Sequence, residues 1–282
     1  MPERIVNALT LDVEESSTLG ADGMHRLPGR VAGQTQRMLD LLDAYGARAT
    51  FFTLGVVAQQ HPRLVRDIVG RGHEVACHGW NHAPVFRLGP AGFRADVRRA
   101  KHAVEQAAGR IIRGYRAPSH SIRRDTPWAF TVLAEEGFSY DSSIHPVRHD
   151  RAGFANAPRF AHVARNVDGV DFWEIPIGTA RIGGVNVPVG GRCFRLLPAA
   201  VLRAAVARVN TREQRPIVFD VPPPERERPS GRATLVRRVR HAGTLTPAEH
   251  KLADILGAFS FASIESVFDE VRPARRAAAR AS

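Results

Sequence analysis

Along the first half of the chain, short apolar runs alternate with segments whose apolar positions recur at helical spacing. The runs predict strands at residues 5–11, 49–54, 74–77 and 111–115. The helical spacing predicts helices at residues 31–45, 62–71, 90–108 and 126–136. Strands that alternate with helices in this order are typical of a parallel sheet covered by helices.

The pattern is less regular in the second half. Residues 145–171 read as a long irregular loop, a kind of segment that is usually functional or disordered. Strands are predicted at 172–177, 217–221 and 259–264, and a helix at 198–209. With no internal repeat and no linker, we expect one α/β domain, barrel-like and with about seven or eight strands, over residues 1–271. The Arg- and Ala-rich tail, residues 272–282, is expected to be disordered.

Composition narrows the function classes only a little. A chain of 282 residues, 44% of them hydrophobic, can form a single α/β barrel. The net charge of +12 comes mainly from arginine and would favour anionic partners. The arginines are spread along the chain, so a coding bias explains the charge equally well.

The two cysteines, Cys77 and Cys193, exclude a disulfide framework and a thiolate zinc site. The N-terminus has no apolar segment of the signal-peptide type, and no apolar run is long enough to span a membrane. A cytoplasmic location is therefore expected.

Polar side chains gather where the predicted strands end. Asp12 and Glu14 end the first strand, the "HGWNH" stretch with His78 and His82 follows the third, and Arg116 follows the fourth. The carboxyl ends of parallel strands meet at one rim, so these side chains should converge. One carboxylate and two imidazoles can hold a metal with open positions, and a second carboxylate can take a proton from water. The pattern predicts a divalent metal site.

Five stretches resemble the polysaccharide deacetylases of the NodB-homology type, and in particular the subgroup found with bacterial exopolysaccharide and exosortase loci. They read "LTLDVEE", "ATFFTLGVVAQQHPRLVRDIVGRGHEVACHGWNH", "GYRAPSHSI", "YDSSIHPVRHDRAG" and "FWEIPI", and the resemblance runs from about residue 4 to about residue 268. It implies a distorted (β/α) barrel, usually of seven strands. It also implies hydrolysis of N- or O-acetyl groups of sugars with a bound divalent metal, often zinc; cobalt or another divalent ion is the alternative.

The resemblance assigns the metal site and its base. Asp12 matches the general base, and His78 and His82 match the two imidazole ligands. Glu14 fits the third, carboxylate ligand by its two-residue offset from Asp12. Glu15 is the alternative, and the family often places this acid directly after the base, where this chain has Val13.

Further matches lie in the later motifs. Arg116 matches the arginine that orients the base, and the backbone amide of Ser119 matches the group that holds the oxyanion. Asp141 matches the acid that tethers the general-acid histidine; its alternatives are a structural pair with Arg116 or a turn cap. Trp80 and Tyr115 are expected to bind substrate, with core packing as the alternative for Trp80.

The chain departs from the family in the last motif. Pro222 stands where the family has the general-acid histidine, and no histidine lies between His162 and His241. General acid–base help contributes about 10²–10⁴-fold to a rate, so activity is in doubt. His120 and His145, which stand where the subgroup usually has an aromatic residue, could replace the acid, as could Asp220.

Three functions are compatible with these patterns, and a fourth, nucleic-acid binding, is not expected. The first is a metal-dependent deacetylase of an N-acetylated sugar in a polysaccharide or its lipid-linked precursor. The second is a hydrolase of another C–N bond, such as a cyclic imide or amide. The third is a metal- and sugar-binding homologue without turnover. Nucleic-acid binding is not expected, because the chain has no recognised motif and only three Trp and three Tyr.

Overall fold

Seven parallel strands form the centre of the structure, a computed structural model that describes residues 5–15, 18–19, 25–26, 29–147, 154, 156–222 and 246–268. In sheet order they are β12 (Val218–Val221), β1 (Val6–Val13), β4 (Thr50–Thr53), β5 (Glu74–Cys77), β6 (Gly114–Tyr115), β7 (Tyr140–Asp141) and β9 (Val170–Glu174). The tail at 272–282 lies outside the described residues.

The sheet curls until its two ends meet. Ile177, just after β9, forms a parallel bridge with Val218 of β12, and the Gly178 amide donates to the Val218 carbonyl at 2.9 Å. β8 (His162–Val167) adds an antiparallel strand beside β9, and β13 (Ser260–Ala262) pairs with the start of β1. The predicted distorted (β/α) barrel of about seven strands is confirmed.

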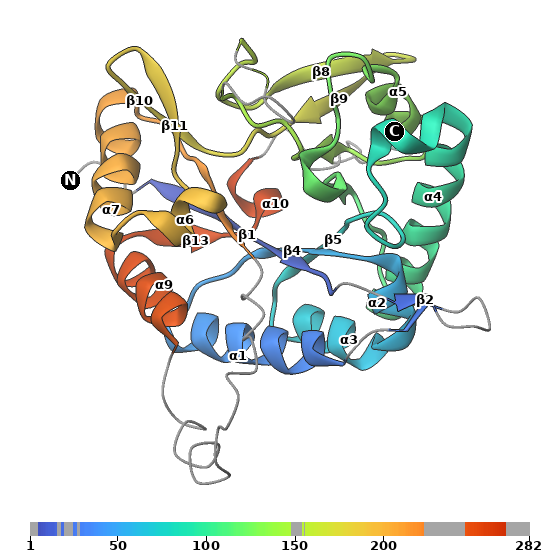
Figure 1. The fold of residues 1–282 in the computed structure, drawn as a ribbon, viewed down its shortest axis with the longest axis horizontal. Coiled ribbons are helices and arrows are strands. Elements are labelled where there is room, and N and C mark those ends of the chain that lie inside the picture. The colour runs from blue at the N-terminus through green and yellow to red at the C-terminus, as the bar shows by residue number, and fades with distance from the viewer. Residues whose placement is uncertain are drawn as a thin grey trace, which may run out of the picture.

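Helices surround the barrel (Figure 1). They are α1 (Arg30–Ala44), α2 (Gly55–Gln60), α3 (Pro62–Gly70), α4 (Val85–Ala108), α5 (Trp128–Glu135), α6 (Arg192–Leu196), α7 (Ala199–Arg208) and α9 (Pro247–Ala258). The short helix α10 (Ile264–Val267) instead packs against the inward-facing side chains of the strands, such as Phe52 and Ala76. The fold also has two short helical turns, η1 (Pro118–His120) and η2 (Val209–Glu213). Two further pairs of strands lie outside the main sheet: β2 (Thr18–Leu19) with β3 (His25–Arg26), and β10 (Thr179–Ile182) with β11 (Val185–Pro188). Within the described part of the chain, each helix is too short or too polar to cross a bilayer.

Most predicted helices begin and end within two residues of the observed ones. The exception is α4, which starts at Val85 rather than at residue 90. Its first turn is separated from the rest by Gly89, whose φ of 65° and ψ of 172° break the helix just before Pro90. The sequence pattern therefore located the second, longer part of α4.

The prediction of an irregular loop over 145–171 is wrong for its second half. Residues 162–174 form the β8–β9 hairpin, whose turn residues Asp168 and Gly169 have φ of 50° and 80°. An Asp-Gly pair with both φ positive is a strong hairpin signal. It was missed because the strands lie at the sheet edge, and Val163 and Val170 are exposed rather than buried in the core. The β10–β11 hairpin and α9 were also not predicted.

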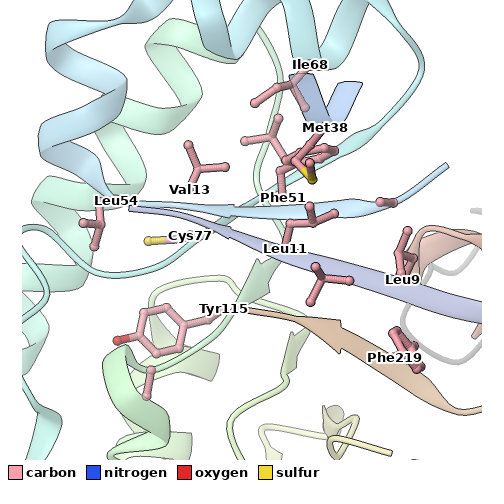
Figure 2. Close-up of a cluster of buried hydrophobic side chains, with 14 of the residues drawn as sticks. Leu9, Leu11, Val13, Met38, Phe51, Leu54, Ile68, Cys77, Tyr115 and Phe219 are labelled. Carbon is pink, nitrogen blue, oxygen red and sulfur yellow. The ribbon is translucent and has the colours of Figure 1, made fainter. Parts of the chain in front are cut away.

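Side chains of β1 alternate between two environments. Leu9, Leu11 and Val13 point into the buried cluster between sheet and helices, with Met38, Phe51 and Phe219 nearby (Figure 2). Thr10 and Asp12 have the opposite orientation and face the barrel interior, where an arginine side chain lies. The apolar layer fixes the register of β1 because a one-residue slip would exchange the two faces.

A neutral polar cluster occupies the barrel interior near the amino ends of the strands. Glu74 accepts hydrogen bonds from the hydroxyls of Thr50 and Tyr140, both at 2.6 Å, and from the Glu265 amide at 3.1 Å. Burial, with the nearby Glu265 charge, raises the pKa of Glu74 to about 7 against the hydrogen bonds that lower it. The carboxyl group therefore favours its protonated form.

Because the pKa of Glu74 is raised in the fold, we expect the free energy of unfolding to fall as the pH rises. An acid whose pKa is higher in the folded than in the unfolded chain stabilises the fold below the unfolded pKa, and this stabilisation is lost between about pH 4.5 and 7. We expect the free energy of unfolding to fall by roughly 2–3 kcal/mol over this window through Glu74. Urea unfolding at several pH values, parent against Glu74→Gln, measures the difference; equal slopes would contradict the prediction.

Candidate active site

The end of β1 places two carboxylates on the same side of the chain. Asp12 and Glu14 both face the barrel opening, as their two-residue offset predicts, while Val13 between them is buried in the core. Glu15 lies elsewhere: its carboxylate accepts hydrogen bonds from the Arg30 and Val31 amides at the start of α1. Glu14, not Glu15, therefore lies beside the two histidines.

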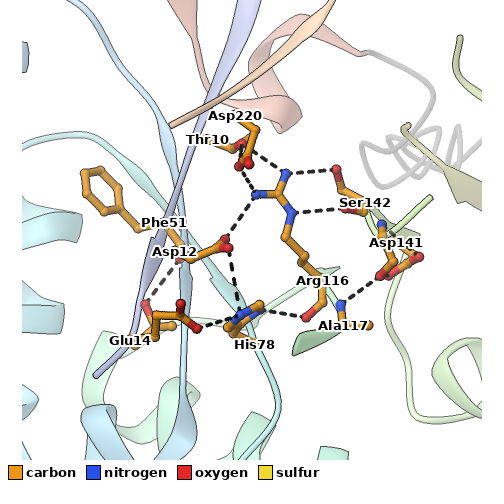
Figure 3. A network of polar contacts seen from close by, with 12 residues as sticks. Thr10, Asp12, Glu14, Phe51, His78, Arg116, Ala117, Asp141, Ser142 and Asp220 are labelled. Carbon is orange, nitrogen blue, oxygen red and sulfur yellow. Dashed lines mark hydrogen bonds and ion pairs between the residues drawn. The ribbon is translucent and has the colours of Figure 1, made fainter. Parts of the chain in front are cut away.

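Glu14, His78 and His82 form a compact set of donor atoms, all within 4.8 Å of one another. Glu14 Oε2 is 3.3 Å from His78 Nε2 and 2.8 Å from His82 Nε2. Asp12 Oδ2 lies 3.9 Å from His78 Nε2 (Figure 3). The three elements that meet here are the ends of β1 and β5 and the loop after β5.

A hydrogen bond to the main chain orients the His78 ring. Its Nδ1 lies 2.9 Å from the Arg116 carbonyl oxygen, an acceptor, so Nδ1 carries the proton and Nε2 is left with a lone pair. His78 Nε2 is buried, and no hydrogen-bonding partner satisfies it among the described residues. An oriented imidazole with such an Nε2 is typical of metal ligands.

The donor set fits a divalent metal. Two imidazole nitrogens and one carboxylate oxygen suit zinc and related ions. Burial by itself would raise the pKa of Glu14, but the two imidazoles hold it well below its ordinary value. Burial likewise opposes the rise in the pKa of His78 that Asp12 and Glu14 cause. The two imidazoles thus favour the ionised form of Glu14, which is the form that binds a metal.

The Arg116 guanidinium is fully buried and connects Asp12 to the rest of the barrel (Figure 3). Its Nη1 donates to Asp12 Oδ1 at 3.1 Å and to Asp220 Oδ1 at 2.6 Å. Nη2 donates to the Thr10 hydroxyl at 3.0 Å, and Nε donates to the Ser142 carbonyl at 3.0 Å. Its ion-pair partners are thus Asp12 and Asp220; the alternative of a pair with Asp141 is wrong.

Asp141 lies in a separate, fully buried cluster. Its carboxylate accepts hydrogen bonds from the Ser143 amide at 3.1 Å and the Ser143 hydroxyl at 2.6 Å. Burial and the Asp141 charge raise the pKa of neighbouring Glu174 well above its ordinary value. Among the described residues, the hydrogen bonds given for the Asp141 carboxylate come from Ser143, so the expected tether of a histidine stays a prediction.

Ser119 and His120 occupy a strained turn. Both belong to η1 and have φ of 52° and 51°, and His82 has φ of 67°. Left-handed conformations of residues other than glycine cost energy and concentrate at functional sites. The Ser119 side chain is exposed, as expected if its amide lies at the open rim.

His120 and His145 come together beside the Arg116 network. Their ring centroids are 5.9 Å apart. Burial, together with Arg116 and His145, lowers the pKa of His120 to about 4 against the opposing effect of Asp220 and Asp12. Pro222 lines the same small cavity, of about 20 Å³, as Asp12 and Glu14. The position without its histidine therefore lies next to the two carboxylates.

The expectation that Trp80 and Tyr115 bind substrate is corrected by their burial. Tyr115 is the last residue of β6, directly before Arg116. Because Arg116 faces the interior, Tyr115 points outward, where its ring packs between Phe93 and Phe138. Trp80 is 6% exposed and lies in the same apolar cluster, with the Arg99 guanidinium 3.5 Å from its ring. Both are core residues.

Two positioning acids carry no motif of their own. Asp96 of α4 accepts a hydrogen bond from the Trp80 amide at 3.0 Å and so holds the loop that carries His78 and His82. Asp220 pairs with Arg116 and accepts a hydrogen bond from Thr10 at 3.0 Å. The only signal for Asp220 was its place at the end of a predicted strand, and Asp96 had none, because its partner is a backbone amide 16 residues away.

We expect removal of the buried Arg116 guanidinium to lower the free energy of unfolding strongly. Arg116→Met leaves Asp12 and Asp220 without their shared cation, and breaking a buried ion pair costs about 3–5 kcal/mol. Arg113→Met, at a half-buried arginine with no ion pair in the described part of the chain, is the matched control and should cost about 0.5 kcal/mol or less. Denaturant unfolding compares the two; similar losses would count against the network.

Sequence comparisons match the two halves of the chain separately. Residues 22–138 match the family model described as "Polysaccharide deacetylase", and residues 142–269 match a "Domain of unknown function (DUF3473)". A chitooligosaccharide deacetylase of Bradyrhizobium sp. (strain ANU 289) is 36% identical over 111 residues, which are 39% of this chain and 48% of that protein. One of Sinorhizobium fredii is 35% identical over 39% of this chain and 49% of that protein. The chain thus spans about half the length of these curated relatives.

Solved structures of the same fold cover nearly the whole chain. A putative polysaccharide deacetylase from Mycobacterium smegmatis superposes with a TM-score of 0.62 at 23% identity, over 96% of this chain and 92% of that one. A CE4 family pseudoenzyme from Bacillus anthracis gives 0.54 at 15% identity, over 96% and 67%. Motifs, fold and family match agree that residues 22–138 carry a polysaccharide deacetylase domain, of NodB or CE4 type.

Proposed function

We propose that the protein is a metal-dependent hydrolase that removes acetyl groups from N-acetylated sugars of a polysaccharide or its lipid-linked precursor. The observation that carries the proposal is the convergence of Glu14, His78 and His82 beside a carboxylate, Asp12, that is not part of the three-residue set. The similarity to chitooligosaccharide deacetylases supports the choice of an N-acetylated sugar.

Glu14, His78 and His82 would hold the metal. A divalent ion there, zinc or cobalt, would supply a Lewis acid for the attacking water and the acetyl carbonyl. Asp12 takes the proton from the water, and Arg116, whose Nη1 lies 3.1 Å from Asp12 Oδ1, holds this carboxylate with Oδ2 turned toward His78. The Ser119 amide, at the exposed turn, is the donor that we assign to the developing oxyanion.

The proton donor for the leaving amine is the step on which activity depends. We assign it to His120, because this imidazole lies near Asp220 and Asp12 and Pro222 cannot donate a proton. With its pKa lowered to about 4 by burial, His120 is mainly neutral near pH 7. The rate at neutral pH is therefore expected to be low, and it should rise in mild acid.

A second candidate is a homologue that binds metal and sugar without turnover. The observation that favours it is Pro222, which lies beside Asp12 and Glu14 at the place of the family's general-acid histidine. A protein of similar fold from Bacillus anthracis is described as a pseudoenzyme, and a mutant of it as having restored enzymatic activity.

Acetate release separates the two candidates. The purified protein, loaded with zinc or cobalt, should release acetate from chitooligosaccharides, and Asp12→Asn should lower the rate about 10²–10⁴-fold because the general base is lost. Metal content per chain, measured in the same samples by mass spectrometry, should be kept in Asp12→Asn and lost in His78→Ala.

Asp67→Asn, at an exposed acid of α3 remote from β1, is the matched control and should behave as the parent does. A parent that binds metal yet releases no acetate would favour the binding homologue. A parent that binds no metal would overturn both candidates.

If His120 protonates the leaving amine, the effect of its substitution on the rate should depend on the leaving group of the substrate. His120→Gln should slow acetate release from N-acetylated sugars by about 10²-fold, since the amine must be protonated to leave. Hydrolysis of p-nitrophenyl acetate, whose leaving group needs no proton, should be unchanged. Pro222→His should increase release from the sugars. Equal losses on both substrates would instead indicate that His120 acts on the structure of the turn.

A further inference from the structure

An arginine-lined hollow of about 380 Å³ lies between the β10–β11 hairpin and the segment that joins α7 to β12. Four arginines line it with a single acid, and the set is Arg159, Arg181, Arg208, Arg212 and Glu213. The hairpin turn, Gly183–Gly184, forms one wall, and no atom of another residue lies within 4 Å of a Cβ built at either glycine. The hollow is therefore open at this turn.

Of the four arginines, one, Arg159, has an ion pair with a residue in the described part of the chain. Arg159 donates from Nη1 and Nη2 to the Glu213 carboxylate at 2.6 and 3.1 Å, and from Nε to the Thr179 hydroxyl at 3.1 Å. This ion pair holds the hairpin against η2 and uses the only carboxylate of the lining. Arg159 and Glu213 thus form a rigid, neutral base for the hollow.

The other three arginines have no ion-pair partner among the described residues. Arg208 uses Nε to donate to the Arg181 carbonyl at 3.0 Å, and its two terminal nitrogens have no hydrogen bond to a residue that the structure describes. The side chains of Arg181 and Arg212 are exposed and have no hydrogen bond or ion pair with any described residue. Three guanidinium groups around one hollow, without carboxylates to pair them, make a site that attracts anions.

The hollow is separate from the metal-ligand cluster. η2 is tied to the start of β1, because the side chains of Asn7 and Asn210 exchange hydrogen bonds of 2.9 and 3.0 Å. Asp12 and Glu14 follow at the other end of β1. Seven residues of extended chain separate Asn7 from Glu14, which is roughly 23 Å. An anion in the hollow therefore cannot be the group that reacts at Asp12.

We propose that this arginine hollow is a second binding site, which takes the phosphate group of a ligand. The planar guanidinium fork donates paired hydrogen bonds to phosphate oxygens. Three such forks, beside a single acid that is already paired with Arg159, match a doubly charged anion better than a single carboxylate.

Two sources would present a phosphate group here. One is a soluble phosphorylated compound; the other is a lipid headgroup at a membrane surface. Ile182 and Val185 flank the hairpin turn and are 47% and 63% exposed, so an apolar tip stands beside the basic hollow. Basic residues beside exposed apolar residues are typical of contact with an anionic lipid surface.

Two probes distinguish the sources. Calorimetric titration with sodium pyrophosphate tests soluble phosphate, and cosedimentation with phosphatidylcholine vesicles, with and without phosphatidylglycerol, tests the lipid surface. The double variant Arg181→Glu with Arg212→Glu should weaken binding of at least one probe about tenfold or more, since two charged hydrogen-bond donors are lost. A bound metal also attracts pyrophosphate, so parent and variant are compared at equal metal content.

Arg63→Glu with Arg66→Glu, two exposed arginines of α3, makes the same change in net charge and is the matched control. It should retain binding within about twofold, because exposed charges are screened beyond about 8–10 Å. Loss confined to the Arg181/Arg212 variant supports the site, and the probe that is lost names the source. No binding of either probe, or equal loss in both double variants, overturns the proposal.

Discussion

The buried charge of Arg116 is the constraint on which the carboxyl rim of the barrel depends. A guanidinium group with no exposure to water is stable only when acids and hydrogen-bond acceptors surround it. Asp12 comes from β1, Asp220 from β12 and the Ser142 carbonyl from the segment after β7. One side chain therefore fixes the relative positions of three parts of the chain that are far apart in sequence.

Arg116 also positions residues in and beside the set of metal-donor side chains, Glu14, His78 and His82. Its carbonyl oxygen accepts a hydrogen bond from His78 Nδ1, and its side chain donates one to Asp12. The histidine ring and the proposed base are thus positioned from one point, which limits how far either can move without the other. Asp220 adds to this rigidity, because its carboxylate pairs with Arg116 and accepts a hydrogen bond from the Thr10 hydroxyl.

The two ends of the barrel differ in chemistry. At the amino ends of the strands, Glu74, Thr50 and Tyr140 share hydrogen bonds without a cation, and burial favours the protonated acid. At the carboxyl ends, acids, imidazoles and one arginine form a charged rim. Apolar side chains such as Phe52, Ala76 and Val218 separate the two layers inside the barrel. The charged rim is thereby kept close to solvent, where a substrate can reach it.

The amino-acid sequence by itself determined the order of strands and helices, the placement of Asp12, Glu14, His78 and Arg116 at strand ends, and the loss of a histidine at Pro222. These follow from local periodicity and from residue identity, which need no knowledge of distant contacts. The β8–β9 hairpin was missed although its Asp-Gly turn is local, because its strands are partly exposed and lack a buried run.

Only the tertiary structure decided which partners the polar groups take. Glu14 rather than Glu15 lies beside the two histidines, and Asp220 rather than Asp141 pairs with Arg116. Trp80 and Tyr115 are buried in the core, and the rings of His120 and His145 lie side by side. Each outcome depends on distances between segments separated by many residues, and the curl of the sheet sets those distances.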